Sequence, residues 1–188
     1  MGVEDTREQL ELVERILATS SRSLCAGGEF YVVWGVMSAG MSLLNQLVAD
    51  GVLPARALWG MVVLIVIGVS FSAWRSNELR KQKDRMSLMQ RDYLMMMYLT
   101  LGITFVAQIA GSNFFAGWGQ AALWNVGASI VLFYLAIHGN RRALAGGIVV
   151  IGALAIANFT PSVAGYVLGG GMLLGYAGFG VAELLARE

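Results

Sequence analysis

The sequence contains few charged residues. Lys, Arg, Asp and Glu make up 13% of its 188 residues, whereas 57% are hydrophobic, and soluble proteins are about one quarter charged. A water-soluble fold cannot bury so much apolar surface. The alternation of apolar and polar residues that a transmembrane barrel requires is missing, and the apolar runs greatly exceed the roughly 9–11 residues of a barrel strand. A bundle of membrane-spanning α-helices is the remaining class.

The sequence has one cysteine, Cys25, and one histidine, His138. A single cysteine cannot form an intramolecular disulfide, and zinc or haem sites need several converging ligands. Ser129 and His138 lie on the same expected helix, so they do not form a serine-protease dyad, which needs facing helices. The loops expected in the cytoplasm contain no glycine-rich phosphate loop. We therefore expect no enzymatic activity, no cofactor, no metal and no nucleic-acid partner.

Six apolar runs have the length of a transmembrane helix, because about 20 residues cross the hydrocarbon core of a bilayer. The run at 143–159 is short, so a re-entrant hairpin is an alternative there. We predict an all-α, polytopic bundle of six transmembrane helices arranged as three hairpins. The six runs are residues 30–49, 57–74, 93–111, 120–138, 143–159 and 163–185.

Lys and Arg are distributed unevenly between the loops. Twelve of the thirteen belong to the amino-terminal segment, the loop at 75–92, the Arg141 and Arg142 turn, and the tail. Only Arg56 belongs to the other side. The positive-inside rule therefore predicts that both termini and the 75–92 loop are cytoplasmic. The first 28 residues hold five acidic residues and three arginines, the reverse of a signal peptide, so we expect the first span to remain as an anchor in a bacterial inner membrane or an equivalent cell membrane.

Two segments are expected outside the membrane, and residues 29–188 form the transmembrane domain. Residues 1–28 have the pattern of an amphipathic cytoplasmic helix. This helix either docks on a cytoplasmic protein partner or packs on its own bundle. The basic loop at 75–92 faces anionic lipid, pairs with the acidic amino-terminal helix, or is simply solvated.

Carboxamide side chains gather at the outer side of the expected spans. They either line a water-filled vestibule for a solute or bond neighbouring helices. No ionisable side chain falls at the middle of the membrane, which argues against a proton-driven pump or a voltage sensor. The leading hypothesis is a passive channel or facilitator for a small solute, and the alternative is a non-transporting scaffold or signalling subunit that acts through its cytoplasmic helix and basic loop. The expected vestibule residues are Asn45, Gln108, Asn125 and Asn158.

Two further groups of residues are candidates for function. His138 and Glu183 fall together at the inner interface, where they form either a pH-sensitive gate or ordinary headgroup contacts. The last span carries two pairs of glycines with GxxxG spacing, which let helix backbones approach one another. These glycines serve packing within one subunit, a subunit interface, or a flexible helix along a path, and we expect a homo-oligomer. The two pairs are Gly165 with Gly169 and Gly171 with Gly175.

Overall fold

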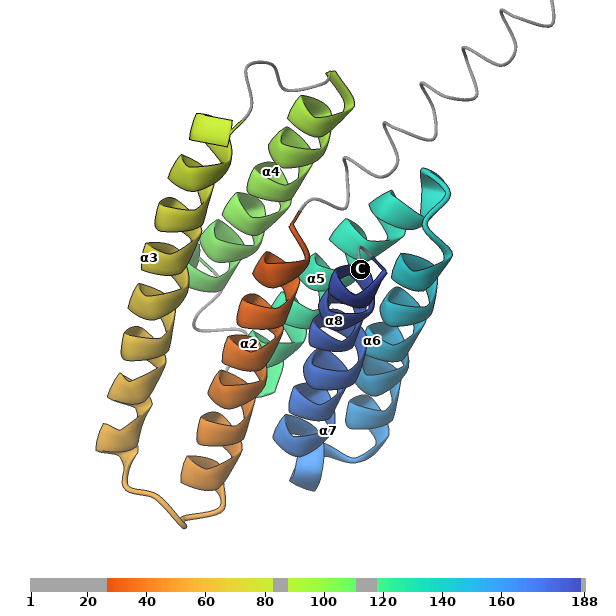
Figure 1. Cartoon of the computed structure of the whole chain (residues 1–188). Coiled ribbons are helices and arrows are strands. Elements are labelled where there is room, and N and C mark those ends of the chain that lie inside the picture. The colour runs from red at the N-terminus through yellow and green to blue at the C-terminus, as the bar shows by residue number, and fades with distance from the viewer. Residues whose placement is uncertain (1–26, 83–87, 111–117, 187–188) are drawn as a thin grey trace, which may run out of the picture.

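The computed structural model describes residues 27–82, 88–110 and 118–186 (Figure 1), and these residues form helices and no strand. The predicted amino-terminal helix and the middle of the 75–92 loop lie outside them. Short 3₁₀ or π segments interrupt the α-helices at three places. In chain order the elements are α2 (Gly28–Ala49), η1 (Ala55–Leu58), α3 (Trp59–Gln82), α4 (Leu88–Ala110), α5 (Trp118–Ile137), α6 (Arg141–Phe159), η2 (Pro161–Val163), α7 (Ala164–Gly171), η3 (Met172–Ala177) and α8 (Gly178–Leu185).

The all-helical fold class predicted from the sequence is confirmed. Five helical stretches of the described chain are long and apolar enough to cross a membrane, and α4 contributes a shorter apolar stretch, Met95–Ala110. α6 runs without a break from Arg141 to Phe159, so its residues form a single helix and no re-entrant hairpin. By length and composition, these helices are compatible with an integral membrane protein that crosses the bilayer several times.

The helix ends follow from local sequence. Gly51 and Gly139 have positive φ angles of 73° and 93°, a conformation that glycine adopts without steric cost. Asn140 then caps α6, because its side-chain oxygen accepts hydrogen bonds from the backbone N–H groups of Arg142 and Ala143, each at 3.0 Å. Such caps satisfy donors that the first turn of a helix leaves free.

The last span consists of α7, η3 and α8 in sequence. It packs between α2 and α6 through small residues. A Cβ atom added to Gly175 would lie 2.6 Å from the carbonyl oxygen of Gly146 on α6, and one added to Gly35 of α2 would lie 2.6 Å from the backbone nitrogen of Ala177. These helices therefore approach at backbone distance. Of the four predicted packing glycines, Gly165 and Gly169 face α2, whereas Gly171 and Gly175 face α6, so all four serve contacts within this chain.

The opposite side of the bundle is loosely packed. α3 packs on α2 and α4 packs on α5, and the described parts of α3 and α4 pack little on one another. In the apolar window of Ala55–Glu78 only 6% of residues are buried, compared with 56% for Pro161–Leu185. The bundle thus has a compact side built around the last span and an open side formed by α3 and α4 (Figure 1).

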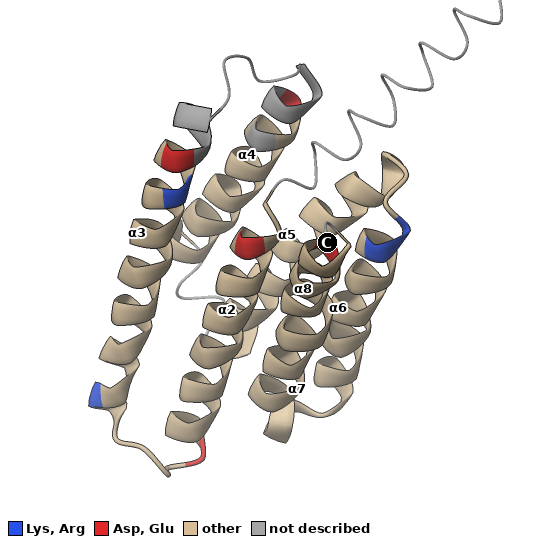
Figure 2. Ribbon diagram, in the orientation of Figure 1, with Lys and Arg blue, Asp and Glu red and all other residues tan. Residues whose placement is uncertain are grey.

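The charged residues that the structure describes lie at the two ends of the ribbon (Figure 2). Arg75 and Arg142 mark one end, which we call the Arg142 end, and Asp50 and Arg56 mark the other, the Asp50 end. Between them the ribbon carries no Lys, Arg, Asp or Glu among the residues that are coloured. This distribution suits a bundle whose middle lies in hydrocarbon, where charge is costly.

The glycine contacts generate a stability prediction. Gly175→Ala should lower the free energy of unfolding by about 1–3 kcal/mol, the usual cost of overpacking, because the new methyl group meets the backbone of Gly146 and the side chain of Val150, each at 2.6 Å. The matched control is Gly170→Ala in the same span, where nothing lies within 4 Å of the added atom. Reversible unfolding in mixed detergent micelles measures both. Equal stabilities of the two variants would contradict the close approach.

Candidate functional site

A cavity of about 420 Å³ lies between α2, α3, α4, α5 and η3. We call it the aromatic cavity, because six of its lining side chains are Phe, Tyr or Trp. Its size is within the roughly 300–1,000 Å³ of ligand pockets. The lining residues are Phe30, Tyr31, Trp34, Ser38, Val69, Ser72, Ala73, Ser76, Asn77, Met97, Tyr98, Leu101, Trp124, Ala128, Met172 and Tyr176.

The wall on the compact side is held by aromatic contacts around Tyr31. Its ring meets Tyr176 edge to face at a centroid distance of 5.2 Å and Phe179 at 4.8 Å, arrangements that the ring quadrupoles favour. Its hydroxyl group also forms a hydrogen bond with the hydroxyl of Tyr93 on α4. Met172 and Tyr176 reach the cavity from η3, a π-helical segment. Such segments are rare and often lie at functional sites.

Three polar residues of the aromatic cavity lie toward the Arg142 end. Ser72, Ser76 and Asn77 of α3 line it there, and Ser72 accepts a hydrogen bond of 2.9 Å from the Nε1 of Trp34. Beside them the Arg75 guanidinium binds both carboxylate oxygens of Glu29, at 2.8 and 3.1 Å. This bidentate pair joins α3 to α2. No charged side chain lines the cavity itself.

A smaller cavity of about 40 Å³ lies toward the Asp50 end. We call it the amide cavity, because three carboxamides line it. Ser38 and Trp124 line both cavities, so these two side chains lie at the boundary. The Nε1 of Trp124 donates a 2.8 Å hydrogen bond to the Oε1 of Gln108 on α4. The lining residues are Ser38, Met41, Ser42, Asn45, Met61, Ile65, Gln108, Gln120, Ala121 and Trp124.

The four predicted vestibule residues occupy three different environments. Asn45 and Gln108 line the amide cavity together. Asn125 is 1% exposed, and its Nδ2 donates to the backbone oxygen of Ala121 at 2.9 Å. Its buried Oδ1 has no hydrogen-bond partner among the described residues. Asn158 is exposed on α6. The structure therefore brings two of the four together and places the other two elsewhere.

Gln46, the neighbour of Asn45, bonds two helices together. Its Nε2 donates to the Asp50 carboxylate at 2.8 Å and to the backbone oxygen of Ser162 at 2.9 Å, and its Oε1 accepts from the N–H of Gly165 at 2.9 Å. The Tyr166 hydroxyl also donates to Asp50, at 2.9 Å. The side chain of Gln46 thus fixes the start of the last span against α2, and it satisfies a free helix N–H group.

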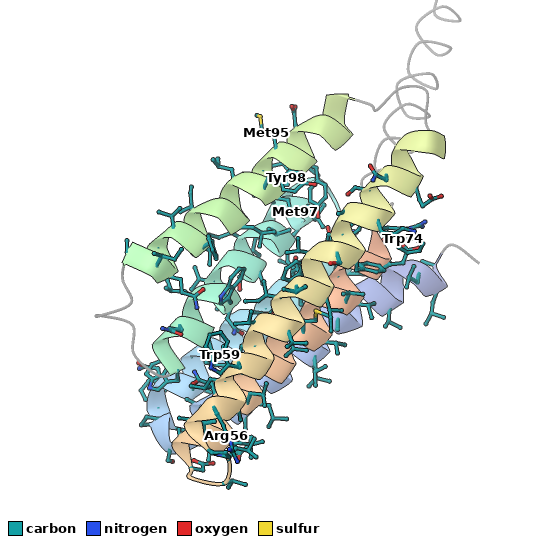
Figure 3. All side chains as sticks on the ribbon, turned by 90° about the vertical axis from the view of Figure 1, so that its left-hand side faces the viewer. Arg56, Trp59, Trp74, Met95, Met97 and Tyr98 are labelled. Atoms are coloured by element: carbon teal, nitrogen blue, oxygen red, sulfur yellow. The ribbon has the colours of Figure 1, made fainter. Side chains whose placement is uncertain are left out.

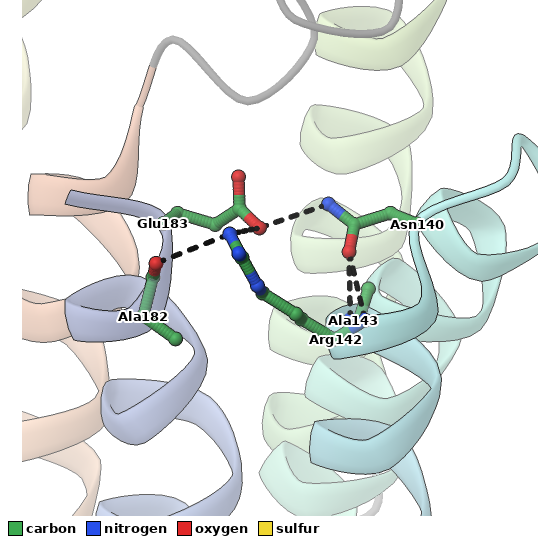
Figure 4. Close-up of polar contacts among 5 residues, drawn as sticks. All are labelled: Asn140, Arg142, Ala143, Ala182 and Glu183. Carbon is green, nitrogen blue, oxygen red and sulfur yellow. Dashed lines mark hydrogen bonds and ion pairs between the residues drawn. The ribbon is translucent and has the colours of Figure 1, made fainter. Parts of the chain in front are cut away.

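The predicted gate residues have separate partners at the Arg142 end. The buried Glu183 accepts a 3.2 Å hydrogen bond from Asn140 and forms an ion pair of 3.6 Å with Arg142 (Figure 4). His138 places its Nδ1 2.8 Å from the backbone oxygen of Tyr134, and its ring packs on the Tyr134 ring at 4.5 Å. Glu183 thus links α8 to the start of α6, whereas His138 packs on its own helix.

Comparison with known proteins assigns no family to the chain. No protein-family model matches it, and neither a curated protein nor a solved structure shows significant similarity. In the part of the chain that the structure describes, no three His, Cys, Asp or Glu side chains gather in a way that could hold a metal ion. The two cavities are therefore the candidate functional sites.

Sequence reasoning missed the aromatic cavity. Phe30, Tyr31 and Trp34 stand at the start of the first expected span, where aromatic residues are common at the membrane interface, so their position alone does not indicate a cavity. The available signal was that Tyr31 and Trp34 share one face of a helix with Ser38, at spacings of three and four residues. This spacing places a polar group beside aromatic rings. It does not say which helices face them.

The hydrogen bonds of Gln46 lead to a second stability prediction. Gln46→Leu keeps the approximate volume but leaves the Gly165 N–H without its acceptor, so the free energy of unfolding should fall by about 1–3 kcal/mol. Asn158→Leu serves as the matched control, because Asn158 is exposed and surface changes are usually within about 0.5 kcal/mol. Detergent unfolding monitored by circular dichroism compares the two variants. Equal effects would show that Gln46 does not join the helices.

Proposed function

We propose that the protein is a passive facilitator for a small neutral solute, with a path that runs through the aromatic cavity and the amide cavity. The observation that carries this proposal is that the two cavities adjoin, sharing Ser38 and Trp124 as lining residues. Together they extend from the Arg142 end toward the Asp50 end. A solute bound in the first cavity lies next to the second.

The chemistry of the lining supports a neutral solute. Aromatic rings, hydroxyl groups and carboxamides line the two cavities, and neither lining includes Asp, Glu, Lys, Arg or His. An ion would lose its hydration there without gaining an opposite charge, which is costly in a membrane interior. A neutral molecule loses less hydration free energy, and it can form hydrogen bonds with the serine hydroxyls and the carboxamides.

Trp124 acts as the gate between the cavities. Its indole group lines both of them, and its N–H group is bonded to Gln108 on the neighbouring helix. This hydrogen bond holds the indole ring in place across the boundary. Rotation of the ring away from Gln108 would join the two volumes. Because α4 belongs to the loosely packed side, the gate can respond to movement of α4.

We further propose the orientation that the basic residues predict. The Arg142 end and both termini then face the cytoplasm, three helix hairpins cross the membrane, and the amide cavity lies toward the outside of a bacterial inner membrane or an equivalent membrane. In a homo-oligomer the contact would involve faces other than the four glycines, since these already contact α2 and α6.

The rival function is a membrane scaffold or signalling subunit. Its proposed cytoplasmic partner would bind the amino-terminal helix and the basic loop, and residues 1–26 and 83–87 of these segments lie outside the described structure. The two cavities favour the facilitator, because a scaffold requires neither of them.

The orientation is tested by cysteine labelling. In a Cys25→Ser background, Val52→Cys at the Asp50 end should react with a membrane-impermeant maleimide in intact cells. Arg141→Cys at the other end should react only after the cells are permeabilised. Both positions are exposed, so burial does not limit either reaction. The opposite labelling pattern would invert the proposed topology.

The gate is tested by solute flux. Trp124→Phe and Gln108→Leu each delete the hydrogen bond between the two residues, whose net strength of about 0.5–1.5 kcal/mol corresponds to a roughly two- to tenfold change in an equilibrium. Both variants should therefore raise the swelling rate of proteoliposomes in glycerol, urea or propane-1,2-diol by a similar factor. Stopped-flow light scattering measures this rate.

Asn158→Leu is the control, because it removes a carboxamide from an exposed position away from both cavities, and it should leave the rate unchanged. If wild-type protein swells no faster than protein-free liposomes with any of the three solutes, facilitation fails. If the wild type conducts but Trp124→Phe has the same rate, the gate is elsewhere.

A further inference from the structure

The aromatic cavity opens sideways, between α3 and α4. Val69 of α3 and Tyr98 of α4 both line it, yet 53% and 59% of their surfaces are exposed. Residues that line a cavity and are also exposed mark its mouth. α3 and α4 pack little on one another, and Figure 3 shows both helices from this side, with Met97 and Tyr98 labelled on α4.

The surface around the mouth is apolar. Val69 is within the apolar stretch Ala55–Glu78, and Tyr98 is within Met95–Ala110. The neighbouring surface of both helices is apolar as well, since Val66 and Leu99 are each 58% exposed. A ligand that uses this mouth therefore comes from the bilayer and not from water.

The lining changes in polarity along the bundle axis. On α3 it passes from Val69 to Ser72, Ser76 and Asn77 toward the Arg142 end, over about 12 Å at 1.5 Å per residue. Toward the Asp50 end the walls are mainly apolar, with Leu101, Ala128 and Met172 beside the boundary residues Ser38 and Trp124.

The polar end lies where charged residues begin. Asn77 and Ser76 follow Arg75, whose ion pair with Glu29 joins α3 to α2. A bound molecule would therefore place its polar group at the level of the lipid headgroups and its apolar part deeper. This is the orientation of a lipid in one leaflet.

The size and charge of the cavity narrow the ligand further. About 420 Å³ is near the lower end of the range for ligand pockets, so it suits one short acyl chain and not the two chains of a phospholipid. The lining carries no charged side chain, and Arg75 is already paired with Glu29. The polar group of the ligand is therefore uncharged.

We propose that the solute of this protein is an uncharged single-chain amphiphile, of the monoacylglycerol type, which enters the aromatic cavity from the bilayer between α3 and α4. The proposal rests on the proposed function and names its solute class. The acyl chain lies among the side chains of Leu101, Ala128 and Met172. The hydroxyl groups lie beside Ser76 and Asn77.

Photolabelling tests the proposal on the full chain in phosphatidylcholine nanodiscs. The probe is 1-monolauroylglycerol with a diazirine near the chain end, and unlabelled 1-monolauroylglycerol is the competitor. Peptides that contain Leu101, Ala128 or Met172 should be labelled, and the competitor should remove this labelling. Labelling of lipid-facing positions such as Val66 should persist, because the lipid surface is not a saturable site.

Ala73→Trp closes the mouth, because Ala73 lines the cavity and is exposed. It should reduce the competable labelling by about tenfold, equivalent to one unit of log affinity. Ala155→Trp is the matched control, an exposed alanine on α6, which does not line the cavity, and it should label like the wild type. Circular dichroism and gel filtration confirm that both variants fold.

The outcomes separate this inference from the proposed function. Absence of competable labelling in the wild type overturns the amphiphile site, and if glycerol flux still depends on Trp124, facilitation stands without it. Competable labelling that Ala73→Trp does not reduce overturns the entrance. Competable labelling that Ala73→Trp removes, in a protein that conducts none of the tested solutes, supports the ligand class and rejects the path past Trp124.

Discussion

The structure depends on how closely backbones approach along the last span. Within a bilayer, apolar side chains gain little by leaving lipid, so helices associate through dispersion contacts and hydrogen bonds. Gly175 against Gly146 and Gly35 against Ala177 bring three helices to distances that a single methyl group would prevent. α2, α6 and the last span therefore form a closely packed unit, and α5 packs on α6 and α2 to complete it.

The cavity exists where this close packing ends. α3 and α4 present valine, leucine, methionine and aromatic side chains, many of them more than half exposed, and such side chains keep backbones apart. Each of the two helices is attached to one neighbour of the compact unit. Two such helices around a compact core leave space between them, and the rings of Trp34, Tyr31 and Trp124 only partly fill that space. The difference in side-chain size between the two sides of the bundle thus accounts for both the closely packed helices and the cavity beside them.

Much of the fold could be predicted from the sequence, because the length and apolarity of a span are local properties. The six apolar runs correspond to six helical stretches of the described residues, and α6 is one uninterrupted helix over the one ambiguous run. The sequence pattern correctly indicates that the glycines of the last span pack closely against other helices. It does not indicate that one pair faces α2 and the other α6, because that depends on which helices are neighbours. The π segment at Met172–Ala177 has no signal of its own in the sequence, since no proline marks it.

The site was harder to predict, because carboxamides expected at a similar depth in the membrane lie in different environments. Asn158 is exposed, Asn125 is buried within the compact unit, and Asn45 and Gln108 line a cavity. Depth in the membrane, which the sequence supplies, does not distinguish these cases. The environment of each carboxamide depends on the direction in which its side chain points around the helix axis. Which neighbours lie in that direction is known only once the helices have packed.

Gln46 and Gln108 show how packing turns the same chemical group to different uses. Gln46 bonds to a backbone N–H, a backbone carbonyl and a carboxylate in tight contact with Gly165, so it cannot release one partner without leaving buried groups unsatisfied. Gln108 bonds to the indole N–H group of Trp124, a residue that lines both cavities. The first amide therefore links two helices through three buried contacts, whereas the second bonds a side chain at the boundary of two cavities.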